Sequence, residues 1–387
     1  METKVENNDQ LVFMLGNCAV IIKHLLSISV DDTKSKAYKT NYNDLLRLPE
    51  ISYWKKRIPM SIDVTTILGS KDSCFENSFA KLLTYGLNTS EILPKNLLMK
   101  YLSFLEEKKC ENIYDSLARL VVANYLFASG LSNNIVDEIV TKRINCLFDF
   151  VTSSPIKFNI YSESTEIRIP SQYHSKKLVN PILYQKNELI LPLVYDIFIF
   201  YHIYEKVSES LRIKIDTIIE YISDSRYQAF DYGYGLIKRS KNKFHSMGWS
   251  THLPFYNDNL ATNYFEKGLI YRMVLFSKFN NPVIQNWIEE MLIKLEKFKI
   301  NSYQYCFPHQ LLPETKNSYF MNGRHMGLGE NRTKKLSRII ESTYYIYIIQ
   351  KNRRGFEKWN SLLVPHPFFK TVIIKFNYGK PIIMIKS

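Results

Sequence analysis

Apolar residues recur every three to four positions along this 387-residue chain, and successive apolar stretches are separated by only a few residues. This spacing is typical of amphipathic helices, and a short connection makes two consecutive helices antiparallel neighbours. Three helix pairs are predicted in this way, at 114–129 with 134–151, 193–207 with 208–223, and 262–279 with 282–298. A chain built from such pairs is mostly α-helical.

Single helices are predicted at 13–28, at 73–85, directly after Pro94 and at 333–350. Ser73 and Glu76 have the spacing of a capping box, which satisfies backbone N–H groups at a helix start. Apolar and β-branched residues predict a C-terminal β-hairpin at 371–385 that turns at 378–381, and a shorter hairpin at 178–191. The predicted domains are an N-terminal helical region at 1–70, a helical core at 71–351 and a β-hairpin tail at 352–387.

Cysteine usage and the N-terminal residues bear on the compartment. The five cysteines are odd in number and widely spaced, without a CxxC pair, so free thiols in a reducing compartment are expected. The first ten residues are polar and acidic, and no apolar run reaches about 18 residues. The prediction is a cytoplasmic protein.

The formal net charge is +14, which favours anionic partners in general. The basic residues are spread along the chain in short runs and form no long basic tail, which indicates a solvated lysine-rich surface. This distribution argues against nucleic acid as a partner, leaves a peripheral membrane contact open and does not specify an oligomeric state.

Two long connections, 226–261 and 301–335, carry the groups best suited to chemistry. Connections of this length in a compact domain are often functional. The first contains Tyr232, Tyr234, His245, Trp249 and His252 between glycines. Histidine and tyrosine transfer protons and aromatic rings bind ligands, whereas the alternative for each histidine is a structural role. The glycines favour a loop or a bulged strand, so paired metal ligands are not predicted, and no cofactor is expected.

The second connection contains Arg324, His325, Glu330 and Arg332 around the sequence Gly327-Leu328-Gly329. Glycines just before a helix can present backbone N–H groups to an anion, and the arginines add forked donors. No βαβ pattern precedes these glycines, which excludes the usual dinucleotide-binding motif. Both connections are expected to line one opening of the helical core.

Two carboxylates, Asp196 and Glu341, lie within apolar helical stretches. Burial raises the pKa of a carboxyl group and can make it a general acid. The alternative is an internal salt bridge or, for Asp196, a helix cap. Glu76 is a candidate for contacting substrate as well as for capping.

Paired helices, aromatic-rich connections and a glycine-punctuated C-terminal half resemble the α/α toroid of terpene cyclases and protein prenyltransferase β-subunits, over about residues 75–350. The resemblance implies an aromatic-lined cavity that stabilises cations. The chain departs from the cyclase acid motif, because Ser29-Val30-Asp31-Asp32 lacks the first aspartate. The Asp-Asp-x-x-Asp metal motif is also missing.

Three functions follow from these observations. The first is an enzyme acting on an apolar isoprenoid-like molecule, with Asp196 or Glu341 as the acid and Tyr232, Tyr234 and Trp249 lining the cavity. The second is a lyase or hydrolase of an acidic glycan, in which Arg324 or Arg332 binds a carboxylate, His245 or His325 takes a proton and Tyr234 protonates the leaving oxygen. The third is a non-catalytic module that binds a protein or nucleic acid.

Overall fold

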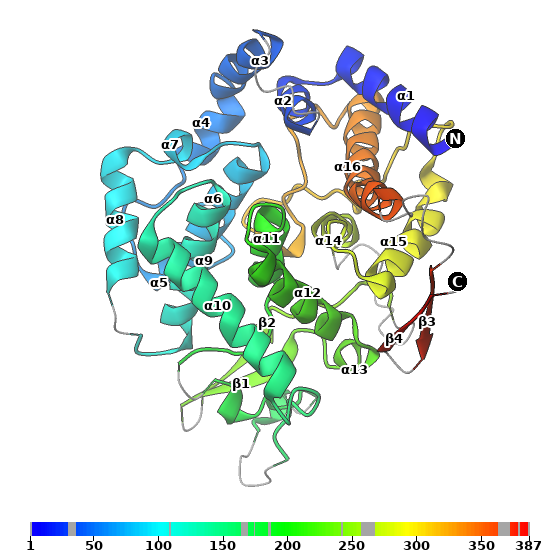
Figure 1. Ribbon diagram of the computed structural model, residues 1–387. Coiled ribbons are helices and arrows are strands. Elements are labelled where there is room, and N and C mark those ends of the chain that lie inside the picture. The colour runs from blue at the N-terminus through cyan, green and yellow to red at the C-terminus, as the bar shows by residue number, and fades with distance from the viewer. Residues whose placement is uncertain are drawn as a thin grey trace.

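The computed structural model is mostly helical, as the sequence predicts (Figure 1). It describes residues 2–29, 36–107, 110–163, 169–173, 175–184, 187–240, 243–256, 268–362, 372–377 and 380–385. Within these residues no helix has the length and apolar character needed to cross a membrane. All five cysteines are free.

The three predicted helix pairs are present. They are α9 (Ile113–Ala128) with α10 (Asn134–Ser153), α11 (Val194–Ile203) with α12 (Glu209–Ser223), and α14 (Leu269–Phe276) with α15 (Pro282–Leu295). Side chains of Asn112, Asn133, Ser208 and Asn281 accept backbone N–H groups at the starts of α9, α10, α12 and α15, which stabilises these starts. Residues 262–267 of the third predicted pair lie outside the described residues.

The other helices lie before, between and after these pairs. They are α1 (Glu2–Asn17), α2 (Val20–Ser29), α3 (Lys36–Leu46), α4 (Pro49–Lys55), α5 (Val64–Ile67), α6 (Phe75–Thr84), α7 (Thr89–Ile92), α8 (Lys95–Glu106), α13 (Ser225–Gln228) and α16 (Lys335–Leu362). Pro94 is the N-cap of α8, so the helix predicted after this proline is confirmed.

Two helix starts differ from the prediction. The stretch 13–28 is divided between α1 and α2, because the carboxylate of Glu330 accepts the backbone N–H of Ala19 at 2.5 Å and caps the start of α2. The capping box predicted at Ser73 and Glu76 is wrong: Cys74 is the N-cap of α6 and makes no side-chain cap bond. Glu76 instead accepts the backbone N–H of Gly69.

Two antiparallel two-stranded sheets occur among the described residues. The predicted C-terminal hairpin is confirmed as β3 (Val372–Asn377) and β4 (Lys380–Ile385). Strands β1 (Tyr234–Ser240) and β2 (Lys243–Gly248) form a hairpin inside the first connection, with an irregularity between Lys238 and Ser240. In the described part of 178–191 there is no second hairpin, because Leu178 and Val179 form single bridges with Leu236 and Tyr161.

The first helix of each pair is more buried than the second. Eight of the ten residues of α11 and seven of the eight residues of α14 are buried, against six of fifteen in α12 and five of fourteen in α15. The buried helices contact one another in chain order, α6 with α9, α9 with α11, α11 with α14 and α14 with α16. In Figure 1, α11 and α14 lie in the middle of the molecule, while α8 and α15 lie toward opposite edges.

A single cluster of buried apolar side chains extends from Met14 to Ile349. It includes Trp54 and Ile67 from the predicted N-terminal region together with residues of the pairs, so the core continues across the predicted boundary at residue 70. Helix α16 likewise continues across the predicted boundary at 351–352.

Candidate functional site

Both long connections contact the amino ends of the buried helices. The carbonyl of Trp249, in the first connection, accepts the N–H of Val194 at the start of α11. In the second connection, the N–H of Phe320 is donated to the side chain of Asn77 near the start of α6. At Gly268, the N-cap of α14, φ is +59° and an added Cβ would lie 2.5 Å from the carbonyl oxygen of Asn322. A side chain is therefore excluded where the backbone of the second connection passes the start of α14.

Three buried carboxylates each bind the backbone of the segment just before their own helix. Glu76 accepts the N–H of Gly69, Asp196 accepts that of Leu193, and Glu341 accepts that of Leu328. Glu76 and Asp196 lie in the first turns of α6 and α11, where the helix dipole favours negative charge. Each carboxylate thus binds backbone from the connection that precedes its own helix.

Asp196 and Glu341 are also bound to arginines. Asp196, which is fully buried, receives two hydrogen bonds from Arg143, of 2.9 Å from Nε to Oδ1 and 2.7 Å from Nη2 to Oδ2. Arg143 donates further hydrogen bonds to the carbonyls of Leu189 and Leu191. Glu341 accepts from Nε of Arg332. Both carboxylates thus form the internal salt bridges that the sequence offered as the alternative to an acid role.

Burial raises the pKa of two of these carboxyl groups. For Glu341, the guanidinium of Arg332 and the N–H of Leu328 offset only part of this effect. For Glu76, burial outweighs the hydrogen bonds from Tyr195 and Gly69 and raises the pKa to about 7. Glu76 is enclosed at 1% exposure, so the side chain has no open face toward a ligand.

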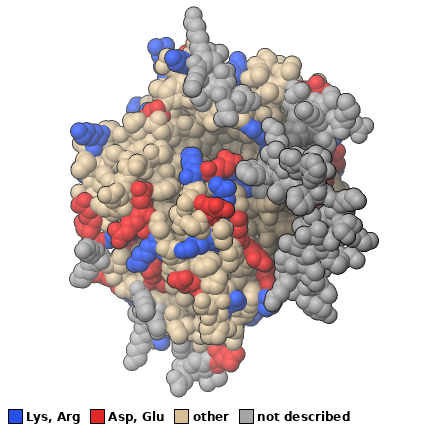
Figure 2. Space-filling view, viewed as in Figure 1, with Lys and Arg blue, Asp and Glu red and all other residues tan. Residues whose placement is uncertain are grey.

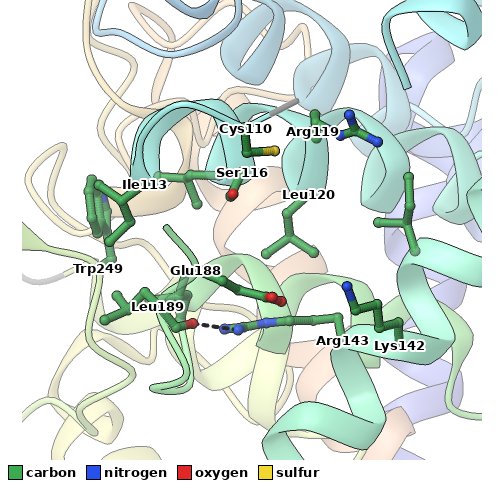
Figure 3. Close-up of a pocket in the computed structure, with 13 residues that line it drawn as sticks. Cys110, Ile113, Ser116, Arg119, Leu120, Lys142, Arg143, Glu188, Leu189 and Trp249 are labelled. Atoms are coloured by element: carbon green, nitrogen blue, oxygen red, sulfur yellow. Dashed lines mark hydrogen bonds between the residues drawn. The ribbon is translucent and has the colours of Figure 1, made fainter. Parts of the chain in front are cut away.

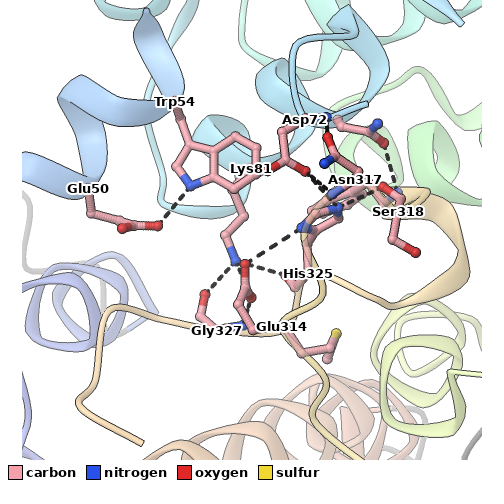
Figure 4. Close-up of polar contacts among 12 residues, drawn as sticks. Glu50, Trp54, Asp72, Lys81, Glu314, Asn317, Ser318, His325 and Gly327 are labelled. Carbon is pink, nitrogen blue, oxygen red and sulfur yellow. Dashed lines mark hydrogen bonds and ion pairs between the residues drawn. The ribbon is translucent and has the colours of Figure 1, made fainter. Parts of the chain in front are cut away.

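A buried lysine organises the second connection (Figure 4). Nζ of Lys81, on α6, donates to Oε2 of Glu314 at 2.9 Å and to the carbonyls of His325 and Gly327 at 2.9 and 2.7 Å. Burial alone would raise the pKa of Glu314, but Lys81 and His325 outweigh burial and hold this pKa at about 2. Glu314 therefore carries its negative charge throughout the physiological range.

His325 lies in the same cluster and is 3% exposed. Its Nε2 is 2.7 Å from the carbonyl oxygen of Ser318, and its ring packs edge-on against Trp54 at 5.5 Å between centroids. Nδ1 lies 3.6 Å from Oε1 of Glu314. The structure thus places His325 inside a packed polar cluster.

The glycine-rich turn predicted to bind an anion binds carboxylates of the chain itself. The N–H of Gly327 is donated to Glu314 and that of Leu328 to Glu341. The N–H groups of this turn therefore do face negative charge, but the charge belongs to the side chains of Glu314 and Glu341.

The aromatic and histidine residues of the first connection divide into buried and exposed groups. Tyr234 is buried. Its hydroxyl contacts the hydroxyl of Tyr227 and donates to the carbonyl of Pro192. His252 is buried between Ser250 Oγ and the carbonyl of Phe230. The exposed residues are Tyr232, which is 41% exposed, and His245, whose ring on β2 lies 5.2 Å from that of Tyr114.

A pocket of about 390 Å³ lies between α9, α10 and the segment before α11; we call it the α9–α10 pocket (Figure 3). One wall is apolar and the lining also carries basic groups. The apolar lining includes Ile113, Leu117, Leu120, Ile139, Leu193 and Trp249. The basic lining residues are Arg119, Lys142 and Arg143, and the acidic one is Glu188, which reaches into the middle of the pocket beside Leu120 in Figure 3.

A second pocket, of about 460 Å³, lies within the second connection; we call it the Arg324 pocket. Its charged lining residues are Glu314, Arg324 and Arg332, and His309 and Thr315 lie beside them. Both connections thus pack against the amino ends of the buried helices, but they line different pockets. The sequence had led us to expect one opening lined by both.

Several residues of these sites, such as Lys81, Arg119, Lys142, Arg143 and Glu314, were not predicted from the sequence. Lys81 and Arg143 each interrupt the apolar face of a helix, which is the same signal that singled out Asp196 and Glu341. Glu314 lies on an irregular segment, and nothing in the local sequence distinguishes it.

In the part of the chain that the structure describes, no group of three or more His, Cys, Asp or Glu side chains is arranged to hold a metal ion. Comparisons of the chain with protein-family models, curated proteins and solved structures give no match.

Proposed function

We propose that this protein is an α/α toroid that binds a small molecule, with an apolar body and an anionic end group, in the α9–α10 pocket. The toroid is supported by the alternation of buried and partly exposed helices in each pair and by the contacts of the buried helices in chain order. In such an arrangement the buried helices begin at one end, where the long connections pack.

The single observation that carries the ligand class is the mixed lining of the α9–α10 pocket. Its volume of about 390 Å³ is within the range of about 300–1,000 Å³ that is usual for small-molecule sites. The apolar wall removes a hydrocarbon body from water, and Arg119 and Lys142 attract an anionic group. The charge of Arg143 is already opposed by Asp196.

The guanidinium of Arg119 is held in place by the chain. Its Nη2 donates to the carbonyl of Leu105, and its Nη1 is enclosed without a hydrogen-bond partner among the residues that the structure describes. Because Nη1 is closed off from solvent, Arg119 acts on an anionic ligand through its charge and not through a hydrogen bond from this atom.

An isoprenoid with a phosphate or carboxylate end belongs to this ligand class, so the isoprenoid substrate inferred from the sequence remains part of the proposal. The acid role for Asp196 or Glu341 has less support, because both carboxylates are engaged by arginines and by backbone N–H groups. Of the three aromatic residues inferred to line the cavity, Trp249 supports the proposal, because it lines the α9–α10 pocket.

A small molecule is also favoured over nucleic acid by the surface charge. Figure 2 shows basic and acidic side chains interspersed over the visible face, without a continuous basic stripe. Phosphate backbones are bound by clustered basic residues, so this face is a poor match for them.

The proposal is tested by isothermal titration calorimetry with dodecyl phosphate, geranyl phosphate and uncharged dodecanol. The two phosphates are expected to bind and the alcohol to bind about tenfold more weakly or not at all, because it lacks the charge that Arg119 and Lys142 attract. Lys142→Gln is expected to weaken phosphate binding about tenfold. The matched control Lys294→Gln removes the same charge from an exposed position of α15 and should leave phosphate binding unchanged.

Equal binding of the phosphates by Lys142→Gln and the unaltered protein would contradict the charge assignment. Absence of binding by both phosphates in the unaltered protein would contradict the proposed ligand class.

A further inference from the structure

The α9–α10 pocket contains a carboxylate that the proposed ligand class does not use. Glu188 lies on the segment between α10 and α11, and its side chain reaches into the middle of the pocket (Figure 3). It is half-buried, and neither of its oxygens is enclosed by the protein. Among the residues that the structure describes, none forms a hydrogen bond or a close ion pair with this carboxylate. Both oxygens of Glu188 are therefore open to a ligand in the cavity.

The neighbouring arginine does not take up this carboxylate. The charges of Arg143 and Glu188 interact, but the N–H groups of Arg143 are donated elsewhere. They bind both oxygens of Asp196 and the carbonyls of Leu189 and Leu191. Arg143 thus keeps Glu188 ionised without occupying it as a hydrogen-bond donor.

Lys142 brings a free charge of opposite sign to the same pocket. It lies one residue before Arg143 on α10, its side chain is exposed, and in the described part of the chain it forms no ion pair. A ligand head group with negative charge alone is attracted by Lys142 but repelled by Glu188. A head group that carries both charges satisfies both residues, and the repulsion selects against ligands that carry only one.

We infer that the ligand of the α9–α10 pocket is an amphiphilic α-amino acid, which carries a primary ammonium group next to its carboxylate. The carboxylate lies toward Lys142, the ammonium group donates hydrogen bonds to Glu188, and the hydrocarbon body packs on the apolar wall that includes Trp249. This inference rests on the function proposed for the pocket and narrows its ligand class, because it adds a cationic group to the apolar body and the anionic end.

The test is isothermal titration calorimetry at neutral pH with decanoate, α-aminodecanoate and α-hydroxydecanoate, which share one hydrocarbon chain and one carboxylate. The amino acid is expected to bind about tenfold more tightly than the other two, because only its ammonium group offsets the charge of Glu188. Glu188→Gln is expected to remove this preference by weakening the binding of α-aminodecanoate about tenfold without weakening that of decanoate. The variant should fold, since within the described residues no hydrogen bond depends on Glu188.

Two further variants serve as controls. Glu290→Gln removes the same charge from an exposed position of α15 and should leave the preference for the amino acid unchanged. Ser116→Phe, which fills the α9–α10 pocket, should abolish the binding of all three ligands. Equal binding of decanoate and α-aminodecanoate by the unaltered protein would overturn the inference, as would a full preference in folded Glu188→Gln. Binding of α-hydroxydecanoate as tight as that of the amino acid would overturn the ammonium assignment.

Dodecyl phosphate, used as a reference ligand, separates this inference from the proposed function. If dodecyl phosphate and decanoate bind but the ammonium group brings no gain, the role of Glu188 is wrong and the proposed function stands. If none of these amphiphiles binds, the proposed ligand class is wrong and the inference falls with it.

Discussion

At the scale of single residues, the buried carboxylates explain how irregular backbone is held against helix starts. A backbone N–H that loses water must find another acceptor, and a carboxylate near a helix amino end is favoured there by the dipole. Glu76 and Asp196 fill this role in the first turns of α6 and α11, and Glu341, further along α16, accepts the N–H of Leu328. The burial of Asp196 and Glu341 and the capping role of Asp196 could be predicted from the local sequence. The partners of Glu76 and Glu341 could not, because Gly69 and Leu328 lie on irregular segments.

Glu76→Gln is predicted to make the protein more stable at and above pH 7. The pKa of Glu76 is raised from an ordinary value of 4.5 to about 7 in the folded state, mainly by burial. Folding therefore favours the protonated form, and the associated stability is full below pH 4.5 and declines as pH rises through 7. The neutral amide avoids this decline, which amounts to about 3 kcal/mol at most.

The measurement is urea unfolding of both proteins between pH 4.5 and 8. The difference in unfolding free energy should shift in favour of Glu76→Gln as pH rises. A difference that stays constant across this range would show that Glu76 does not change its protonation as described.

At the scale of elements, Arg143 and Asp196 join α10 to the start of α11. Arg143 also binds the carbonyls of Leu189 and Leu191, so one side chain fixes two helices and the segment between them. This pair also positions one side of the α9–α10 pocket, which Arg143 and Leu189 line.

Arg143→Met is predicted to lower the unfolding free energy by about 3–5 kcal/mol, because it leaves the carboxylate of Asp196 buried without its cation. Asp196→Asn should cost less than Arg143→Met, since the amide oxygen can still accept the N–H of Leu193. The double variant should cost less than the sum of the two single changes, because the two residues interact directly. Urea unfolding measures all three, and strictly additive costs would contradict a direct coupling of these residues.

The helix pairs were predictable from sequence because short connections and Asn or Ser caps act locally. The start of α2 was not, since Glu330, which caps it, is 311 residues away from Ala19. The predicted start of α6 was wrong for a related reason. Glu76 has the spacing of a capping box, but in the fold it accepts the N–H of Gly69. Local patterns therefore predict which segments are helical better than where distant contacts divide or begin them.

At the scale of the whole molecule, the long connections pack against the amino ends of the buried helices and border two pockets of different character. The sequence indicated that these connections are functional, and Trp249, Arg324 and Arg332 do line pockets. It did not separate them from Tyr234, His252 and His325, which the fold buries in packed polar clusters. The same residue types serve both purposes, and only tertiary contacts distinguish them.

The central claim is that the α9–α10 pocket binds an apolar anion. It is tested most directly at Trp249, because this residue lines the pocket. Trp54 and Trp287 are buried elsewhere. Tryptophan fluorescence is recorded while dodecyl phosphate is added to the unaltered protein, to Trp249→Phe and to Ser116→Phe. We predict a saturable change in the unaltered protein, loss of the signal but retention of calorimetric binding in Trp249→Phe, and loss of both in folded Ser116→Phe. Undiminished binding by folded Ser116→Phe would place the ligand elsewhere and contradict the claim.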